Sequence, residues 1–350
     1  MPFAITLQPS GRAFEVQRDD TLLAAAIQQG IGLPYGCKDG ACGSCKSRLL
    51  AGSVRHGAHQ QKALSDAEEA AGLILTCCAT PMSDCTVEAR SVPGAGEFPV
   101  LKMPTRVLSI ARPTPDVALL RLQLPANQRV QYHAGQYVEF ILAGGVRRSY
   151  SMANAPSRLG SPPALELHIR HLPGGLFTDA VFGTMKEKDI LRIEGPFGSF
   201  FLRNEPHDQA RPMVLLASGT GFAPIKALIE QLQDSGSQRP AVLYWGCRSR
   251  ADLYLHDWAE LAAATMPNLR YIPVLSAPQA GDDWAGRTGL VHQAVRADLP
   301  DLSGHQVYAC GVPVMVDAAQ RDFTARCGLP VEQFLADAFT SEADKAGALG

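Results

Sequence analysis

The feature that most constrains this chain is a group of cysteines in a glycine-rich segment. Cys37, Cys42 and Cys45 lie within GCKDGACGSCK, and six of the nine cysteines fall between positions 37 and 85. Nine is an odd count, and the reducing compartment that we expect for this chain disfavours disulfides among the six, so we expect a metal site. The glycines between the cysteines let backbone N–H groups turn towards clustered thiolates, which a bulkier loop would not allow.

The spacing of the cysteines narrows the choice of metal. A C-x4-C-x2-C run followed by a further cysteine after 31 intervening residues is typical of a plant-type 2Fe-2S cluster. Zinc is the rival, but its sites usually pair two C-x2-C knuckles, and the second pair is missing here. Cys77, Cys78 and Cys85 are all candidates for the fourth ligand. We predict a strand at Cys77 and Cys78, so only one of these two should face the cluster.

Two segments resemble plant-type ferredoxins: YGCKDGACGSCK and the LTC of GLILTCCATPMSDC. The resemblance implies that the cysteine after Leu-Thr, Cys77, is the fourth ligand, and that Cys78 and Cys85 are structural. Residues 1–92 carry nine acidic and eight basic side chains, unlike the strongly acidic photosynthetic ferredoxins. Long-range electrostatic steering onto a basic partner is therefore not expected.

The first 92 residues read as a small sheet around one helix. Strand patterns at 3–8 and 13–17 flank the turn at 9–11, and a helix capped by Asp20 ends at Gly30. A further strand at 47–50, polar irregular chain, and strands at 74–76 and 86–89 follow. The fold expected for residues 1–92 is a β-grasp 2Fe-2S ferredoxin domain, and residues 93–102, rich in Pro and Gly, form a linker.

Two more domains are expected after the linker. Short strand patterns with one helix near 178–185 predict an antiparallel β-barrel over residues 103–205. Alternating apolar strands and helices then predict a parallel α/β domain over residues 210–341. The small and polar residues 342–350 are expected to form a flexible tail. The fold class is thus multidomain, α+β followed by α/β.

The barrel contains two short motifs, RSYS and HIRHLPGGLFT. Together they resemble the flavin motifs of the ferredoxin-NADP reductase superfamily, which implies FAD as a cofactor. An arginine and open amides suit a diphosphate, and an aromatic ring and a hydroxyl suit the flavin ring. His168 and Ile169 would flank the cofactor by analogy, although His168 reads equally well as a strand histidine with satisfied hydrogen bonds. The expected flavin-binding residues are Arg148, Ser149, Tyr150, Ser151, His168, Ile169, Gly174, Gly175 and Thr178.

The parallel domain opens with a strand, the loop GTGFAP and a helix, which places glycines at a helix N-terminus where a pyrophosphate can bind. This loop and CGVPVM resemble the nucleotide elements of the same superfamily. The resemblance puts Cys310 beside the reacting nicotinamide and lays Phe339 of FLADAFT on the flavin, so Cys310, Ser151 and Phe339 are the expected catalytic residues. The expected nucleotide-binding residues are Gly219, Thr220, Gly221, Pro224, Arg248, Arg250, Cys310, Gly311 and Met315.

The choice between NADH and NADPH turns on the strand end YWGCRSRADLY. Arg248 and Arg250 could hold a 2′-phosphate, and no acidic residue immediately follows the strand to select NADH. The nearest resemblance uses NADH, however, so we expect NADH, with NADPH as the alternative.

The resemblance spans almost the whole chain and follows the domain order of the reductase components of bacterial oxygenases. RIEGPFGSFFLR, LVHQAVRADLPDL and VYACG resemble, more narrowly, the CDP-6-deoxy-glucoseen reductase type that serves a deoxysugar dehydrase. The implied activity passes hydride from NADH to FAD and then single electrons through the 2Fe-2S cluster to a protein acceptor, an oxygenase or dehydrase component. Two alternatives remain: an electron carrier or redox sensor with little nucleotide turnover, and a zinc-stabilised binding module.

Composition excludes other classes of partner. Hydrophobic residues make up 46% of the chain and charged residues 19%, with a net charge of −2, so general attraction to nucleic acid or anionic lipid is not expected. The N-terminus lacks a signal-peptide pattern and no apolar run is long enough to span a membrane. We therefore expect a cytoplasmic protein.

Overall fold

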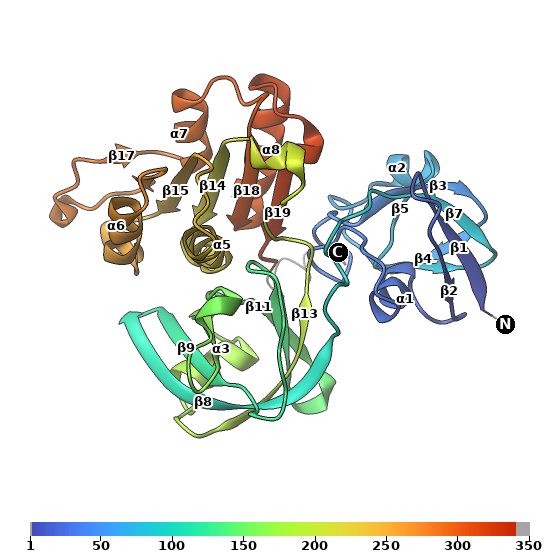
Figure 1. Ribbon diagram of the computed structural model, residues 1–350, viewed down its shortest axis with the longest axis horizontal. Helices are drawn as coiled ribbons and strands as arrows, with labels where there is room; N and C mark the ends of the chain where they lie inside the picture. Colours follow the sequence, from blue (N-terminus) through green and yellow to red (C-terminus); the bar gives the residue numbers. More distant parts are fainter. Residues whose placement is uncertain (1, 341–350) are drawn as a thin grey trace. The chain divides into compact units, whose positions relative to one another are not determined.

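The computed structural model describes residues 2–340 (Figure 1). The tail expected at 342–350 lies outside the described residues. The described chain divides into two compact units. The first comprises residues 2–100, Phe197–Phe200 and Thr340, and the second comprises Leu101–Pro196 and Phe201–Phe339.

The first unit is built on a five-stranded sheet of order β2-β1-β7-β3-β5, in which β1 runs antiparallel to β2 and parallel to β7. Alternate residues of β1 such as Ile5 and Leu7 are buried, and so are Leu22 and Leu23 of the helix. The expected small sheet around one helix is confirmed. Its elements are β1 (Phe3–Gln8), β2 (Ala13–Val16), α1 (Leu22–Gln28), β3 (Lys46–Ala51), β4 (Val54–His56), α2 (Asp66–Ala70), β5 (Leu73–Leu75), β6 (Ala79–Pro81) and β7 (Cys85–Glu88).

Two local expectations for this unit were wrong. The N-cap of α1 is Thr21 rather than Asp20, because the Thr21 hydroxyl accepts a hydrogen bond from the Ala24 amide at 3.2 Å. The chain between the strands predicted at 47–50 and 74–76 was expected to be irregular. It contains α2 and the strand β4, which pairs with β6. The helix α2 begins with a capping box in which Ser65 and Glu68 satisfy each other's backbone amides.

The barrel in the second unit is a six-stranded antiparallel sheet of order β11-β10-β13-β8-β9-β12. Along β12, Leu165, Leu167 and Ile169 are fully buried in its core, so the residues between them face outwards. Its helix begins earlier than expected because Gly175 is the N-cap. The elements are β8 (Leu101–Thr114), β9 (Val117–Gln123), β10 (Tyr137–Ile141), β11 (Arg147–Ser151), β12 (Ala164–Arg170), α3 (Leu176–Phe182) and β13 (Ile190–Phe197).

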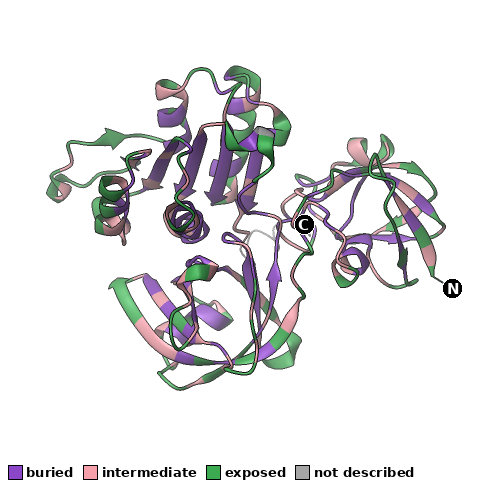
Figure 2. Cartoon of the chain, viewed as in Figure 1, coloured by how far each residue is buried: buried purple, intermediate pink, exposed green. Residues whose placement is uncertain are grey.

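The rest of the second unit is a six-stranded sheet of order β17-β16-β15-β14-β18-β19 in which every pairing is parallel. Its central strands are buried (Figure 2), as a sheet covered by crossover helices requires. Its elements are α4 (Pro206–Gln209), β14 (Met213–Ser218), η3 (Gly219–Gly221), α5 (Phe222–Asp234), β15 (Ala241–Cys247), α6 (His256–Thr265), β16 (Leu269–Leu275), β17 (Arg287–Thr288), α7 (Val291–Asp298), β18 (Gln306–Gly311), α8 (Pro313–Arg326) and β19 (Phe334–Ala338).

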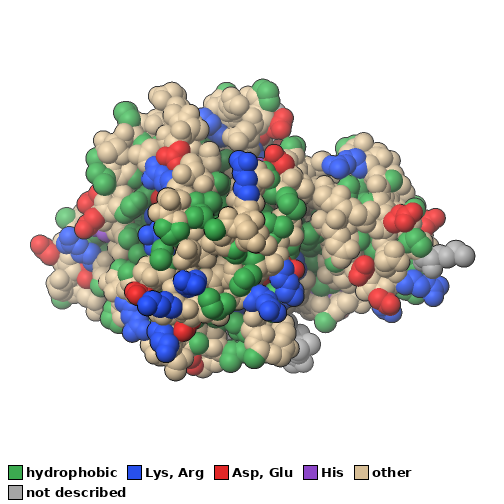
Figure 3. Space-filling model, turned by 60° about the horizontal axis from the view of Figure 1, so that its bottom comes forward, with side chains coloured by type: hydrophobic (Ala, Val, Ile, Leu, Met, Phe, Trp, Pro, Cys, Tyr) green, Lys and Arg blue, Asp and Glu red, His purple; other side chains and the backbone are tan. Residues whose placement is uncertain are grey.

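The surface carries charges of both signs. On the face drawn in Figure 3, Lys and Arg side chains occur together with Asp and Glu among uncharged surface. Within residues 2–340, no helix combines the length and the apolar character that crossing a membrane would require.

Candidate functional site

The four predicted metal ligands lie together in the first unit as two pairs of thiols. The Sγ atoms of Cys37 and Cys42 are 3.1 Å apart, and those of Cys45 and Cys77 are 3.2 Å apart. Across the described residues, no group of three or more His, Cys, Asp or Glu side chains is arranged about a single ion. Two thiol pairs are the donor set of a binuclear cluster, in which each iron takes two cysteines.

Within each pair the pKa of one thiol is lowered and that of the other is raised, because the two sulfurs share a hydrogen bond. The pKa values of Cys37 and Cys45 are lowered, and those of their partners Cys42 and Cys77 are raised. The amide of Cys42 also donates to the Cys37 sulfur at 3.3 Å. Iron is bound by the thiolate form, so all four cysteines would lose their protons when they hold the cluster.

Cys77 does not lie on a strand, so the strand-alternation argument was wrong. Residues 76–78 form a turn between β5 and β6, closed by a hydrogen bond from the Cys78 amide to the Leu75 carbonyl at 3.0 Å. The turn brings the Cys78 sulfur within 3.6 Å of the Cys77 sulfur. Cys85 points elsewhere and contacts the carbonyls of Ser53 and Ser83. The pairing of Cys77 with Cys45 nevertheless supports Cys77 as the fourth ligand.

The RSYS motif forms the last four residues of β11. Tyr150 packs at the edge of an aromatic group, with its ring centroid 5.7 Å from that of Phe140 and 5.2 Å from that of Phe177. Arg148 lies on the same side of the strand and donates to the Arg147 carbonyl at 2.7 Å. A half-buried aromatic ring can stack on a flavin ring, and an arginine beside it can bind the flavin diphosphate.

The loop between β12 and α3 carries the predicted glycines. Gly174 adopts a φ of +81°, which favours glycine. A Cβ atom on Gly175 would lie 2.5 Å from the Thr178 hydroxyl oxygen. That hydroxyl donates to the Leu172 carbonyl at 2.8 Å, and this hydrogen bond closes the loop.

His168 and Ile169 point to opposite sides of β12. The Ile169 side chain lies in the barrel core, so only its backbone is available to a cofactor. Burial lowers the pKa of His168, and the neutral ring uses both nitrogens: Nε2 lies 3.0 Å from Glu166 Oε1 and Nδ1 lies 2.8 Å from the Tyr254 hydroxyl. The hydrogen bonds of His168 are therefore satisfied within the protein.

The nucleotide loop is held against the end of β18 by glycines. A Cβ atom on Gly221 would lie 2.2 Å from the Cys310 carbonyl oxygen, and one on Gly311 would lie 2.1 Å from the Ser218 hydroxyl. Gly219 has a φ of +52°, and its carbonyl accepts a hydrogen bond from the Trp245 indole. The loop then enters α5, where Pro224 is buried in the first turn. This geometry brings open backbone amides to the carboxyl edge of the sheet.

Cys310, Ser151 and Asp337 come together where β18 and β19 end. Asp337 is the register partner of Cys310, and the Ser151 hydroxyl lies 3.3 Å from Asp337 Oδ2. Burial, with a contribution from Asp337, raises the pKa of Cys310, so the thiol stays protonated. Asp337 was missed in the sequence; its place two residues before Phe339 in FLADAFT was the available signal.

The remaining predicted residues differ in their surroundings. The Phe339 amide donates to the Gly311 carbonyl at 2.8 Å, which extends the β18–β19 pairing by one residue. Thr220 lies in η3, between the two loop glycines. The Met315 side chain belongs to the core of the parallel sheet. Ser149 is exposed on β11.

Three family descriptions match the chain in succession. "2Fe-2S iron-sulfur cluster binding domain" matches residues 5–82, "Oxidoreductase FAD-binding domain" residues 104–202, and "Oxidoreductase NAD-binding domain" residues 215–321. A CDP-6-deoxy-L-threo-D-glycero-4-hexulose-3-dehydrase reductase from Yersinia pseudotuberculosis is 41% identical over 341 residues, covering 97% of this chain and 99% of that protein.

The chain belongs to the NAD(P)H-dependent flavin and 2Fe-2S reductases.

Other relatives of this reductase serve oxygenases. The reductase component of phenol 2-monooxygenase from a Pseudomonas species is 36% identical over 326 residues, covering 91% of this chain and 89% of the relative. The crystal structure of the Amycolatopsis cytochrome P450 reductase GcoB superposes with a TM-score of 0.79 at 35% identity, covering 97% of this chain and 99% of that one. The reductase therefore uses FAD, a 2Fe-2S cluster and a nicotinamide nucleotide, and it is an electron-transfer enzyme.

The two arginines after β15 differ in their surroundings. The Arg250 amide donates to the Asp282 carboxylate, and the Arg250 guanidinium donates to the Asp282 backbone carbonyl. The Arg248 side chain is 73% exposed and lies 3.6 Å from Asp252. The Asp252 carboxylate, missed in the sequence because it lies beyond the strand end, also accepts from the Ser249 amide and hydroxyl at 3.0 Å each. The strand end thus carries a fixed negative charge beside an exposed arginine.

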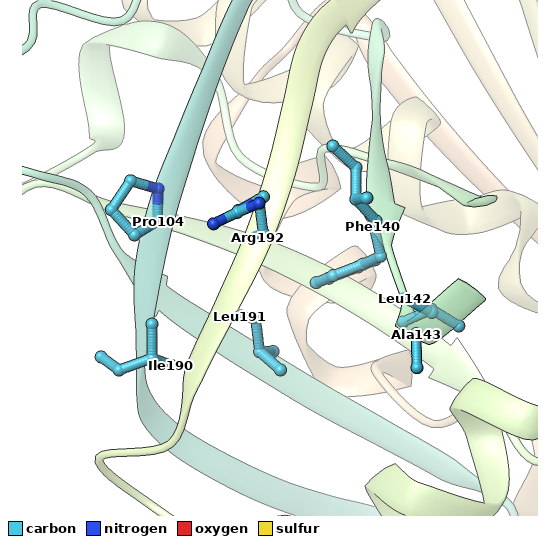
Figure 4. A pocket seen from close by; sticks show the side chains of 8 residues that line it. Pro104, Phe140, Leu142, Ala143, Ile190, Leu191 and Arg192 are labelled. Atoms are coloured by element: carbon cyan, nitrogen blue, oxygen red, sulfur yellow. The ribbon is translucent and has the colours of Figure 1, made fainter. Parts of the chain in front are cut away.

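The reductase also has a surface pocket of about 470 Å³ on the barrel, between the end of β10 and the start of β13 (Figure 4). In the register of β10 and β11, Ile141 of the pocket lies opposite Arg147, whereas Ser151 lies opposite Tyr137. The pocket is therefore at the other end of this strand pair from Ser151. Its position excludes it as the place where Ser151 and Cys310 act.

Proposed function

We propose that this reductase takes hydride from NADH where Ser151, Cys310 and Asp337 converge. We also propose that Cys37, Cys42, Cys45 and Cys77 hold the cluster from which electrons leave for a protein acceptor, here called the outlet. The hydrogen bond between Ser151 and Asp337 carries the proposal. It joins the flavin motif of the barrel to the strand that pairs with Cys310, so a flavin and a nicotinamide bound at their motifs would meet there.

The residues of this site orient the bound cofactor and nucleotide, and they exclude water. Cys310 is fully buried, and its raised pKa keeps it protonated, so it adds no charge next to the proposed nicotinamide position. The Ser151 hydroxyl can donate to one acceptor at a time, and Asp337 fixes its position when no cofactor atom accepts it. FAD, when bound, converts a two-electron donor into a source of single electrons, which neither nicotinamide nor an iron-sulfur cluster can do alone.

The test of the outlet is a Cys77→Ser variant. Because Cys77 forms one of the two thiol pairs, its loss should remove the cluster while the second unit stays intact. We expect flavin bleaching by NADH to be unchanged and cytochrome c reduction to fall by at least about tenfold.

Cys85→Ser is the matched control. Cys85 is buried in the same unit, but its sulfur contacts carbonyl groups and not the other thiols. The control should keep both activities. Normal cytochrome c reduction by Cys77→Ser would sink the assignment of the outlet, and slow bleaching of the wild-type flavin by NADH would instead favour an electron carrier or sensor.

We infer a preference for NADH over NADPH from the charge at the end of β15. The Asp252 carboxylate would repel a 2′-phosphate, and Arg250 is already bound to Asp282. We expect kcat/KM for NADH to exceed that for NADPH by about tenfold or more, since one unscreened charge contact contributes on that scale. An Asp252→Asn variant should narrow the ratio, and an unchanged ratio would contradict this role for Asp252.

The acceptor is proposed by analogy with the relatives. The most similar proteins named above serve a deoxysugar dehydrase or an aromatic oxygenase, so the acceptor is proposed to be a protein component of one of these systems. None of the nine cysteines, all within the described residues, forms a disulfide, and we propose the reducing cytoplasm as the location of this iron-sulfur protein. Purification under reducing conditions on immobilised reductase would identify the acceptor by mass spectrometry.

A further inference from the structure

The pocket at the end of the barrel remote from Ser151 takes no part in the reaction described above. It lies within the second unit, where β10 ends and β13 begins (Figure 4). Its volume of about 470 Å³ is in the range of protein sites that bind small molecules. Seven of the eight residues that line it are apolar, and the eighth is Arg192. This lining indicates a ligand that is apolar over most of its surface and negatively charged at one end.

The walls of the pocket are suited to the apolar part of such a ligand. Phe140 is fully buried, and Leu142 and Leu191 pack against the same barrel core, so the core itself forms one side of the pocket. At the rim, the Ile190 side chain is 63% exposed. An apolar group in the pocket would remove this surface from water, which is favourable in proportion to the area covered.

The charged residue of the pocket, Arg192, has a second arginine as its neighbour. Along β13, Ile193 is buried in the barrel core, so Arg192 and Ile190 face outwards. The register of β8 and β13 sets Arg192 opposite Pro104 and sets Ile190 opposite Arg106. The two arginines are therefore diagonal neighbours on the outward face of the barrel. Within residues 2–340, neither guanidinium has a hydrogen-bond acceptor or a carboxylate partner.

Two carboxylates of the neighbouring strands do not neutralise these arginines. Glu194 lies two residues beyond Arg192 on β13 and faces the same way, yet its carboxylate binds the guanidinium of Arg147 on β11. Glu139 of β10 binds the same guanidinium at 2.8 Å. Arg106 and Arg192 therefore remain two adjacent positive charges without a counter-ion. Such charges repel each other, and an anion bound beside them would relieve the repulsion.

We propose that this pocket binds a small apolar carboxylic acid, an aryl or alkyl acid whose body lies between β10 and β13 and whose carboxylate accepts hydrogen bonds from Arg192. The planar guanidinium of an arginine matches a carboxylate through two parallel hydrogen bonds, and Arg106 adds a second positive charge beside it. A hydrophilic anion such as phosphate would gain only the charge and would leave the apolar walls unused. The site is independent of the proposed hydride site, because the two lie at opposite ends of the β10–β11 pair.

The test is calorimetric titration of the holoenzyme with decanoate and biphenyl-4-carboxylate, and with biphenyl-4-carboxamide as the uncharged counterpart. We expect both acids to bind wild type, and Arg192→Ala to weaken their binding by roughly ten- to hundredfold because charge-assisted hydrogen bonds are lost. The carboxamide should bind wild type and Arg192→Ala equally. Arg121→Ala is the control for net charge, since Arg121 is an exposed arginine of β9 that does not line the pocket, and it should match wild type.

Ala143→Trp shows whether the acids bind in this pocket. Ala143 is an exposed lining residue, so a tryptophan there fills the pocket and should abolish binding of the acids and of the carboxamide. Flavin and cluster spectra should match wild type in every variant, and if Arg192→Ala does not fold, Arg192→Gln carries the same comparison. Failure of the acids to bind wild type, equal affinity of wild type and Arg192→Ala for them, or unchanged binding by Ala143→Trp would each overturn the proposal.

Discussion

At the scale of single residues, burial decides the protonation state of Cys310 at the proposed hydride site. Cys310 is fully buried on β18, and burial, with Asp337 beside it, raises the pKa of the thiol above its ordinary value of 9.0. A raised thiol pKa means that the protonated form is retained to higher pH than in the unfolded chain. Cys310 is therefore a neutral contact and not a nucleophile.

This state gives a pH prediction. Between about pH 7 and about pH 9.5, where an exposed thiol would ionise, the rate of flavin reduction at saturating NADH should show no inflection caused by Cys310. Stopped-flow measurements on wild type and Cys310→Ala would check it. An inflection near pH 9 that is present in wild type and missing in Cys310→Ala would show that the thiol ionises during turnover.

At the scale of the elements, the glycine contacts fix how η3 sits on the end of β18. Replacing Gly221 with alanine would force a Cβ atom to within 2.2 Å of the Cys310 carbonyl oxygen, so the loop must move. We expect Gly221→Ala to retain FAD and the cluster but to lower the rate of flavin reduction by roughly hundredfold, because small displacements of a reacting group are costly.

Gly304→Ala is the matched control for this change. A Cβ atom at Gly304 would meet nothing within 4 Å, and its φ is not positive, so the variant should match wild type. Rapid flavin bleaching by Gly221→Ala, measured in the same stopped-flow experiment, would show that the loop tolerates the added methyl group.

The same elements show how far the sequence alone could lead. The cysteine spacing, RSYS and GTGFAP were identifiable because each is a local pattern with a specific chemical purpose. Asp337 and the pocket beside Arg192 were not, since each depends on segments far apart in the chain meeting at one place. The prediction of a strand at Cys77 was wrong for another reason. The apolar neighbours of Cys77 predict a strand, but a hydrogen bond from the Cys78 amide to the Leu75 carbonyl closes a turn there.

At the scale of the whole molecule, the barrel and the parallel sheet form a single compact unit joined by buried charges. Lys226, Glu230 and Asp234 recur every fourth residue of α5 and so share one face, which contacts the barrel through Glu166, Ala155 and Arg158. Such a joint is costly to break at one partner, because the others are left buried without a counter-charge.

Acid provides the test of this joint. Burial alone would raise the pKa of Glu166, but the hydrogen bond from His168 and the charge of Lys226 lower it to about 2. A lowered pKa stabilises the folded state above the unfolded value of 4.5, and this contribution is lost as pH falls from there towards 2. The size of the contribution is on the order of 3 kcal/mol.

The measurement is the difference in Tm between wild type and Glu166→Gln as a function of pH. The three tryptophans, Trp245, Trp258 and Trp284, all lie in the second unit, so their fluorescence reports its unfolding. The difference in Tm should be largest near neutral pH and should shrink as pH falls below about 4.5. A gap that is independent of pH would contradict an ionised Glu166 in the joint.

The four residues Phe197–Phe200 have a consequence for taking this protein apart. They begin with the last residue of β13 yet belong to the cluster-bearing unit. There the Ser199 hydroxyl donates to the Tyr35 carbonyl at 2.9 Å and accepts from the Tyr35 amide at 2.9 Å. Tyr35 lies two residues before Cys37. A fragment that ends in the linker would lack Ser199 and its hydrogen bonds to Tyr35. An excised electron-transfer domain therefore needs a substitute for Ser199 to keep the conformation of the cysteine loop.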